Sequence, residues 1–191
     1  MIASIQSQIG ILLRPVRPGL GRIAANRPEF AAVPGRLHVT SPAFEEHGDI
    51  PARFTADGEG IAPPLAWSGV PDETEMLALL VEDADGPFPR PLVHAIVPSL
   101  PPGDGDLREG ELPHVRRTEA GATMGRNSLA GRAWLPPAPV PGHGPHRYCF
   151  QIFALDAHPA FPHPPGRARL LAAMRGHVIA IGKLIGCYER R

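Results

Sequence analysis

The chain has 191 residues, and its 19 lysines and arginines are balanced by 19 aspartates and glutamates, so the formal net charge is zero. This balance argues against nucleic acid as a partner, and no stretch reaches the ~20 consecutive apolar residues that a membrane span requires. The 25 prolines and 21 glycines are spread among apolar segments, which indicates many turns and shaped loops rather than disorder. Cys149 and Cys187 lie in apolar contexts, which predicts two buried free thiols and no zinc site.

The first 36 residues differ in composition from the rest. Residues 1–28 hold four arginines and no acidic residue. Apolar residues recur there at the spacing of an amphipathic helix that Pro15 should end: Ile2, Ile5, Ile9, Leu12 and Leu13. The segment lacks the basic start and the cleavage site of a secretory signal, and we expect a cytoplasmic protein. We predict an N-terminal helix and linker over 1–36, docked on a main domain at 37–191 or on a second subunit, with an anionic surface as the alternative contact.

The main domain is predicted to be mostly β. Alternation and apolar runs predict strands over 36–44, 76–83, 92–100 and 147–156. The segment 49–60 is predicted to be a short strand followed by a turn built on Asp57-Gly58. Three of these strands are apolar on both faces, as in the middle of a covered sheet. Toward the C-terminus we expect a helix over 167–175, a short helix or strand over 177–181 and a closing strand over 183–191. The strands follow one another too closely for alternating βαβ units, which argues against a doubly wound sheet.

Polar side chains stand at the ends of three of the buried strands. Asp83 and Asp85 follow the 76–83 run, His94 lies in the next strand, and His146 and Tyr148 open the 147–156 strand. Each has an ordinary explanation when taken alone, as a turn former or a satisfied core residue. Burying all of them without mutual partners would cost several kcal/mol. We therefore expect these side chains to meet in one cleft.

Several motifs in order complete the pattern: "ADGEGIAPPLAW" followed by "SGVP", then "VEDADGP", "LVHAIV", "GRNS", "GPHRYCFQIFALD" and "LIGCYER". From Leu37 to Arg190 the chain resembles the phosphatidylethanolamine-binding protein family, in its bacterial Raf-kinase-inhibitor-like branch. The resemblance implies a mainly β fold, an antiparallel, Greek-key-like β-sandwich with a few peripheral helices. It also implies a pocket for phosphate-like anions such as phospholipid headgroups, formed here by Asp83, Asp85, Pro87, His94, His146 and Tyr148.

The expected function is therefore non-catalytic binding of a small anion or headgroup, without metal or cofactor. The family is also associated with inhibition of kinases and proteases, so a protein target of unknown identity is a further expectation, as is a homodimer. An aspartate beside the histidines should raise their pKa values and favour rings that donate to an anion. Anion binding should then weaken above about pH 7.

The sequence departs from the family pattern at the pocket. Ala84 replaces a usual proline and Gly86 a usual alanine. Pro136 stands where many members have a glycine, and proline has no backbone N–H to offer an anion.

Two enzymatic alternatives use the same residues. Two histidines and an aspartate could hold iron or zinc for a metal-dependent hydrolase. Ser128 or Ser68 could act with a His/Asp pair, although the chain has no GxSxG motif. A module that inhibits a partner protein through the loops around the pocket is the third alternative.

Overall fold

The computed structural model describes residues 2–113 and 124–190. Within this part the two α-helices are α1 (Ile2–Leu13) and α2 (Arg167–Met174), and four short 3-10 turns are also present. The strands are β1 (Gly35–Arg36), β2 (His38–Thr40), β3 (Leu65–Ser68), β4 (Met76–Asp83), β5 (Leu92–Leu100), β6 (Gly105–Leu107), β7 (His146–Leu155) and β8 (Val178–Tyr188). Neither α-helix is long and apolar enough to cross a membrane, among the residues described.

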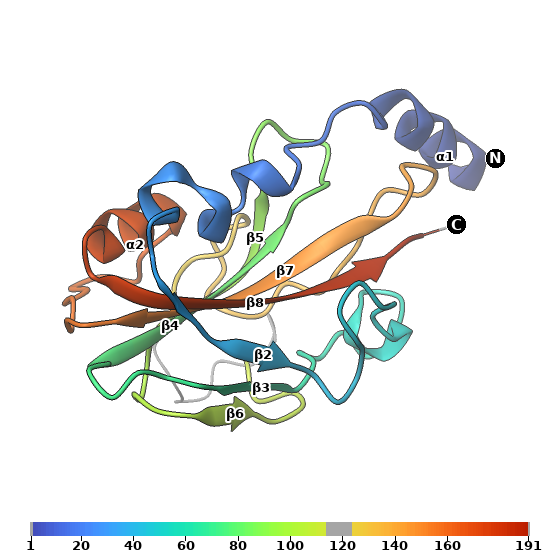
Figure 1. Ribbon diagram of the computed structural model, residues 1–191. Helices are drawn as coiled ribbons and strands as arrows, with labels where there is room; N and C mark the ends of the chain where they lie inside the picture. The colour runs from blue at the N-terminus through green and yellow to red at the C-terminus, as the bar shows by residue number, and fades with distance from the viewer. Residues whose placement is uncertain (1, 114–123, 191) are drawn as a thin grey trace.

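Two sheets organise the chain. The larger sheet has the order β1-β8-β7-β4-β5, and the smaller has the order β2-β3-β6 (Figure 1). All neighbouring strands are antiparallel except β1, which runs parallel to β8 at the edge. Strand β4 is buried along its whole length because its apolar side chains are covered on both faces of the sheet.

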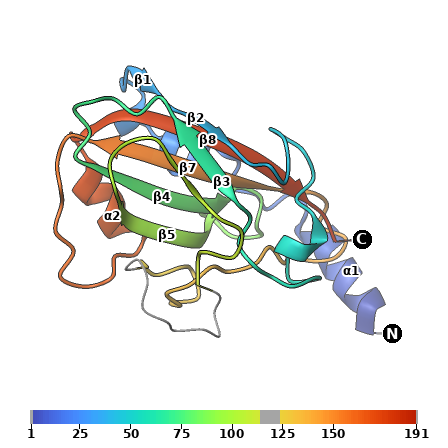
Figure 2. The same ribbon diagram turned by 90° about the horizontal axis from the view of Figure 1, so that it is seen from below.

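One face of the larger sheet packs against the smaller sheet, which crosses it in the view from below (Figure 2). The core between them contains Val39 and Trp67 from the smaller sheet with Leu79 and Phe150 from the larger one. The opposite face is covered by α2 and by the 3-10 turns of the N-terminal segment, through Leu170, Phe30 and their neighbours.

The prediction of a mainly β fold with peripheral helices is confirmed. The expected purely antiparallel pairing is wrong at β1, and the finer description as a Greek-key sandwich stays a prediction. The short strand expected at the start of 49–60 is not formed, because this part folds into a 3-10 turn at Ala52–Phe54 with a single bridge at Asp49, whereas the expected turn at Asp57-Gly58 is present. The two C-terminal pieces form one continuous strand, β8, while β3 and β6 were not predicted. Both cysteines are free thiols, with Cys149 buried and Cys187 half-buried.

The N-terminal segment is packed into the domain. Helix α1 forms over the predicted residues, and the 3-10 turns between Leu20 and Phe30 place Ile23, Ala24 and Phe30 in the core. The division of the chain at residue 36 stays a prediction, but residues 23–30 already contribute buried side chains.

A buried carboxylate fixes this segment to the sheet. Glu82 of β4 is fully buried and accepts hydrogen bonds from the Ala24 backbone N–H (2.7 Å) and from Gln151 Nε2 (2.9 Å). It also forms an ion pair with Arg167, the first residue of α2. Glu82 therefore joins the N-terminal segment, two central strands and α2.

Replacing Glu82 with glutamine should destabilise the protein, because Arg167 would then keep a half-buried charge without its partner. Removing one member of a buried ion pair typically costs about 3–5 kcal/mol. Chemical denaturation of Glu82→Gln measures this loss, and Glu73→Gln at an exposed site is the matched control. Equal stability of the two variants would contradict the role assigned to Glu82.

Candidate functional site

Sheet pairing brings the predicted residues to one edge of the larger sheet. The register between β4 and β7 places Asp83 opposite Tyr148, and the register between β4 and β5 places Asp83 opposite Leu92. A cavity of about 230 Å³ opens there. Of the six predicted site residues, four line it: Asp83, Pro87, His94 and His146. Asp85 and Tyr148 are not among the lining residues.

The Asp83 carboxylate is held on both oxygens. Its Oδ1 accepts hydrogen bonds from the backbone N–H groups of Asp85 (2.8 Å) and Gly86 (3.0 Å). Its Oδ2 lies 2.7 Å from His146 Nδ1. The first pair of bonds forms a tight turn that reverses the chain after β4. The last bond fixes the ring of His146 across the floor of the cavity.

The ring of His146 continues into a chain of hydrogen bonds. Its Nε2 lies 2.7 Å from Nδ1 of His143, and Nε2 of His143 lies 2.9 Å from the Leu13 carbonyl. A carbonyl only accepts, so His143 donates to Leu13. Burial lowers the pKa of His143 and favours its neutral form, which leaves Nδ1 of His143 as an acceptor. With Asp83 ionised, His146 then donates from both nitrogens, to His143 and to Asp83, as a charged ring beside the carboxylate.

His94 has a different environment. Its Nδ1 lies 2.6 Å from the Leu135 carbonyl and donates to it, and the Leu135 N–H donates back to the His94 carbonyl at 2.9 Å. Burial lowers the pKa of His94, with the charge of Asp83 opposing the shift. The expectation of a raised pKa is therefore wrong for His94, because desolvation outweighs the nearby carboxylate. In the neutral ring, Nε2 carries a lone pair.

Three buried polar atoms around His94 have no hydrogen-bond partner among residues 2–113 and 124–190: Nε2 of His94 itself, the Tyr148 hydroxyl and Nε1 of Trp134. The Tyr148 ring meets the His94 ring edge to face at a centroid distance of 5.1 Å, and the Trp134 ring lies 6.1 Å away. Burial raises the pKa of Tyr148 well above its ordinary value, so its hydroxyl is a donor. Buried polar atoms are normally paired, so three unpaired ones in one place indicate a binding site.

Asp85 does not take part in the cavity. Its carboxylate receives Arg147 in a two-pronged ion pair, with Nε and Nη2 each at 2.7 Å. Arg17 adds a longer contact of 3.5 Å. Burial alone would raise the pKa of Asp85, but the hydrogen bonds and charge of Arg147 hold it below its ordinary value. Asp85 thus anchors the turn after β4 to β7 and has no free oxygen facing the cavity.

The rest of the cavity wall is apolar. Phe88, Leu92 and Leu129 lie at its mouth, and Phe88 and Leu129 are exposed. Pro136 lines the wall, so the predicted loss of a backbone donor falls inside the cavity. Within the proline-rich loop 136–140, only Ala138 and Val140 retain a backbone N–H.

The N-terminal segment docks on the loop that carries the two histidines. Gly10 of α1 lies so close to this loop that a Cβ atom there would come within 2.0 Å of the Pro141 carbonyl oxygen. Arg14 donates to the Gly142 carbonyl at 2.7 Å, and Arg17 donates to the carbonyls of Pro145 and His143. Together with the bond from His143 to Leu13, these contacts fix α1 to the loop that carries His143.

Sequence reasoning missed His143. The signal available was a second histidine three residues before His146, set between two glycines in "PGHGPH". Gly142 and Gly144 both have positive φ values, of 78° and 95°. These left-handed residues turn the chain so that the two rings lie 4.8 Å apart.

The residues do not form a typical metal or serine-hydrolase site. In residues 2–113 and 124–190, no group of three or more histidine, cysteine, aspartate or glutamate side chains is arranged to hold a metal ion. Ser128 accepts a hydrogen bond from the Val93 N–H at 2.8 Å, while its own N–H donates to the Val93 carbonyl. Ser128 therefore fastens the "GRNS" loop to β5.

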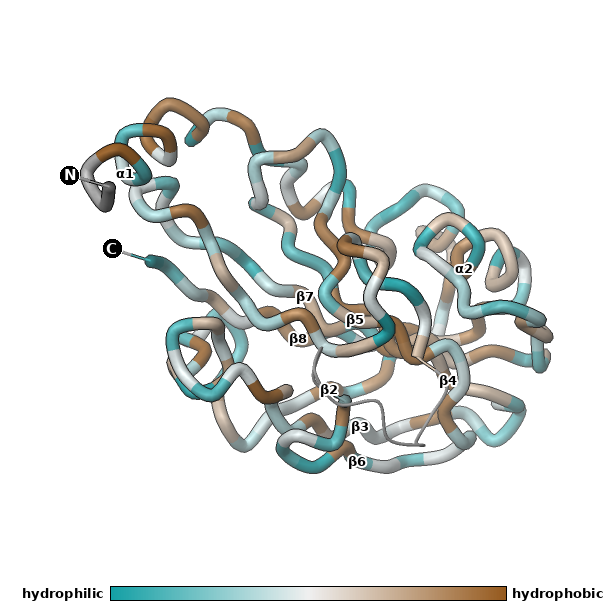
Figure 3. Tube along the Cα trace, turned by 180° about the vertical axis from the view of Figure 1, so that it is seen from behind, coloured by the Kyte–Doolittle hydropathy of each residue, from teal (hydrophilic) through white to brown (hydrophobic). Residues whose placement is uncertain are grey.

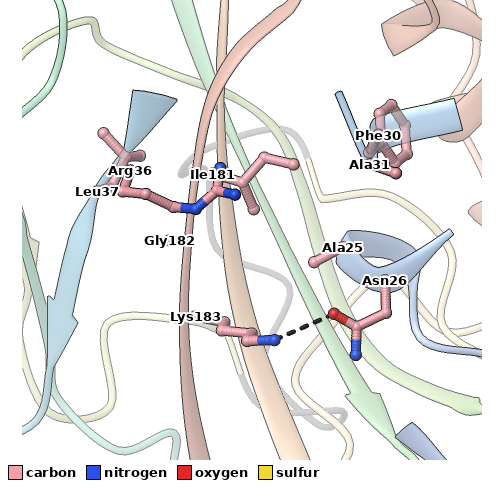
Figure 4. A pocket seen from close by; sticks show the side chains of 9 residues that line it. All are labelled: Ala25, Asn26, Phe30, Ala31, Arg36, Leu37, Ile181, Gly182 and Lys183. Carbon is pink, nitrogen blue, oxygen red and sulfur yellow. Dashed lines mark hydrogen bonds between the residues drawn. The ribbon is translucent and has the colours of Figure 1, made fainter. Parts of the chain in front are cut away.

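A larger hollow of about 420 Å³ lies between the 3-10 turns and β8. None of the predicted site residues lines it (Figure 4). Its polar groups are bonded within the protein, with Lys183 donating to Asn26 and Arg36 donating to the Val33 carbonyl. The cavity at His94 is smaller, but His94 on its wall has an Nε2 atom without a partner among the described residues, and for this reason we take it as the candidate site.

Comparison with known proteins identifies the family of the chain. The family model described as phosphatidylethanolamine-binding protein matches residues 40–189. The chain belongs to this family. A UPF0098 protein of Methanothermobacter thermautotrophicus is 38% identical over 156 residues, which cover 81% of this chain and 99% of that protein. A UPF0098 protein of Aquifex aeolicus is 32% identical and covers 90% of this chain and 99% of its own length.

A solved structure supports the assignment to the phosphatidylethanolamine-binding protein family. The crystal structure of CT736, a homolog of this family from Chlamydia trachomatis, is 34% identical with a TM-score of 0.73. The match covers 83% of this chain and all of that one. The segment before residue 40, which includes α1 and the Leu13 carbonyl, lies outside the family match.

Docking of α1 should depend on the absence of a side chain at Gly10. Gly10→Ala should displace α1 from the loop, because the new methyl group would overlap the Pro141 carbonyl. Hydrogen exchange of the loop amides over 141–146 should become faster in this variant. Gly21→Ala, where a Cβ atom meets nothing within 4 Å, is the control and should leave exchange there unchanged. Unchanged exchange in Gly10→Ala would contradict the docking.

Proposed function

We propose that the cavity at His94 binds a small phosphate-like anion or phospholipid headgroup and does not turn it over. The observation that carries this proposal is the cluster of unpaired buried polar atoms on His94, Tyr148 and Trp134. The Tyr148 and Trp134 rings lie beside His94, which lines the cavity, and their O–H and N–H groups can donate to an oxyanion that reaches them. Membership of the phosphatidylethanolamine-binding protein family supports the same class of ligand.

The size of the cavity supports a small ligand. At about 230 Å³ it lies below the range of roughly 300–1,000 Å³ for sites that take drug-sized molecules. A headgroup is of suitable size, and the apolar mouth at Phe88, Leu92 and Leu129 would face the part of the ligand that continues out of the cavity.

The charges define how the ligand would be held. His94 is neutral when the cavity is free, and an anion beside it would favour protonation of Nε2, which then donates to the ligand. His146 keeps both nitrogens engaged with Asp83 and His143, so it contributes position rather than a free donor. Asp83 Oδ2 accepts one hydrogen bond and has a second lone pair for an ammonium group.

Four further expectations stay predictions. The first is inhibition of a kinase or protease, which would use the loops around the cavity. The second is the cytoplasmic location, which rests on the sequence alone. The absence of catalytic turnover is the third. A homodimer is the fourth, and it is supported by exposed apolar side chains on α1 and in the segment just after it: Ile5, Ile9, Ile11, Leu12 and Val16. The hydrophobic stretches of α1 are coloured brown in Figure 3.

Calorimetry with phosphoethanolamine tests the proposal. His94→Ala and Tyr148→Phe should each weaken binding about tenfold or more, because each removes a hydrogen bond to a charged group. His177→Ala, at an exposed histidine paired with Asp156, is the matched control and should bind as the wild type does. Binding that is unaffected by both cavity substitutions would refute the proposed site.

The pH dependence follows from the lowered pKa of His94. Because the free ring is neutral and the bound ring is protonated, binding takes up a proton, and affinity should fall as pH rises by at most about tenfold per unit. The fall should already be under way below the ordinary histidine pKa of 6.5, since the free-state pKa lies lower. Glycerophosphoethanolamine suits this titration because its phosphodiester does not itself titrate in this range. An affinity that is constant from low to high pH would exclude a protonated His94 in the complex.

A further inference from the structure

A second hollow of the molecule is lined by arginines. It has a volume of about 480 Å³ and lies between the N-terminal segment, the loop before β5 and helix α2. The five arginines of its lining, which we call the arginine cleft, are Arg22, Arg27, Arg90, Arg167 and Arg175. A single acidic residue, Glu29, lines it with them. In a chain of zero net charge, this is a strong local concentration of positive charge.

Three of the five guanidinium groups have no acidic partner. Arg27 pairs with Glu29 at 2.7 Å, and Arg167 pairs with the buried Glu82. The other three, Arg22, Arg90 and Arg175, form no ion pair within the described part of the chain. Arg90 and Arg175 are exposed and form no hydrogen bond to residues of that part either. These groups are free to bind a ligand from solution.

The cleft is also partly preorganised. Arg22 Nη1 donates to the Pro89 carbonyl at 2.9 Å, which leaves its other N–H groups available. Arg167 Nη2 donates to the Arg22 carbonyl at 2.9 Å and ties the N-terminal segment to α2. The pKa of Glu29 is held below its ordinary value by the hydrogen bond from Arg27 and by the charges of Arg27 and Arg175. The positive charge of Arg175 therefore acts across the cleft on Glu29.

Apart from Glu29, the remaining lining residues carry no charge and are small or apolar: Gly21, Pro28, Pro91, Ala168, Leu171 and Ala172. Guanidinium groups bind phosphate through paired, parallel N–H donors. One phosphate group carries at most about two negative charges at neutral pH. Matching three free guanidiniums therefore requires at least two phosphate groups close together.

We propose that the arginine cleft binds a compact ligand with two or more adjacent phosphate groups. The cleft shares no lining residue with the cavity at His94, so the two sites are distinct. A third hollow, lined by Phe88, Leu92 and Leu129 on one side and by Arg90 and Arg167 on the other, lies between them. The proposal does not depend on what the His94 cavity binds.

Calorimetry of the full chain with inorganic pyrophosphate, without divalent metal and at low salt, tests this site. The wild type should bind pyrophosphate, and orthophosphate should bind at least about tenfold more weakly because it matches fewer guanidiniums. Arg90→Gln and Arg175→Gln should each weaken pyrophosphate binding about tenfold. Both side chains are exposed and make no bonds within the described fold, so thermal unfolding should be unchanged in these variants.

Arg169→Gln is the matched control, because Arg169 is an exposed arginine of α2 outside the cleft. It should leave pyrophosphate affinity within about twofold of the wild type, since exposed charges at a distance are screened. Arg175→Lys should recover only part of the affinity, because lysine keeps the charge and loses the paired donors.

Four results would overturn the proposal. The first is no pyrophosphate binding. The second is equal weakening by Arg169→Gln and Arg175→Gln, which would indicate a diffuse basic surface. The third is loss of pyrophosphate binding in His94→Ala with Arg175→Gln unaffected, which would place the ligand in the other cavity. The fourth is tighter binding of single-stranded DNA or anionic vesicles than of pyrophosphate with the same dependence on Arg90 and Arg175, which would assign the cleft to a macromolecular polyanion.

Discussion

The buried bond between Asp83 and His146 is the constraint on which the site depends. It joins the last residue of β4 to the first residue of β7. From His146 the chain of hydrogen bonds continues through His143 to the Leu13 carbonyl. Three hydrogen bonds in a row need three protons, and two neutral histidines supply only two. With Asp83 ionised, the chain is complete only when one histidine is protonated beside the carboxylate. The charge of His146, the position of the loop that carries His143 and the docking of α1 therefore depend on one another.

This arrangement decides which groups can meet a ligand. The nitrogens of His146 and most of the hydrogen-bonding capacity of Asp83 are used within the protein. Around His94, the polar atoms without a partner in the described part of the chain belong to His94, Tyr148 and Trp134. The turn at Asp83 sends Asp85 away from the cavity to Arg147, although the two aspartates are separated by only one residue. A two-residue spacing puts side chains on the same face only while the strand continues, and β4 ends at Asp83.

Much of the fold could be predicted because the central strands are long and apolar. The runs at 76–83 and 92–100 match β4 and β5, and the helix at 167–175 matches α2 within one residue. The short strands β3 and β6 have three or four residues each, too few for a clear period, and they form because the larger sheet offers a face to cover. Within 49–60, by contrast, a short strand was expected and does not form, since Pro51 and the turn at Ala52–Phe54 prevent strand pairing.

Several residues of the candidate site could be predicted, but the protonation of its histidines could not. The resemblance to the family located Asp83, His94 and His146, and the strand register brings them together. The direction of the His94 pKa depends on complete burial, which outweighs the attraction of Asp83, and burial cannot be read from neighbours in sequence. The role of His143 depends on α1, a segment outside the family match, and the arginine cleft joins residues more than 60 positions apart.

Nitrogen-15 NMR of the histidine rings, with and without phosphoethanolamine, tests the central claim most directly. Without ligand, His94 should show a protonated Nδ1 and a bare Nε2, and His146 should show two protonated nitrogens. On addition of ligand, Nε2 of His94 should change to the protonated form, while the exposed His177 keeps its signals. A His146 with one bare nitrogen, or a His94 that does not respond to the ligand, would contradict the account.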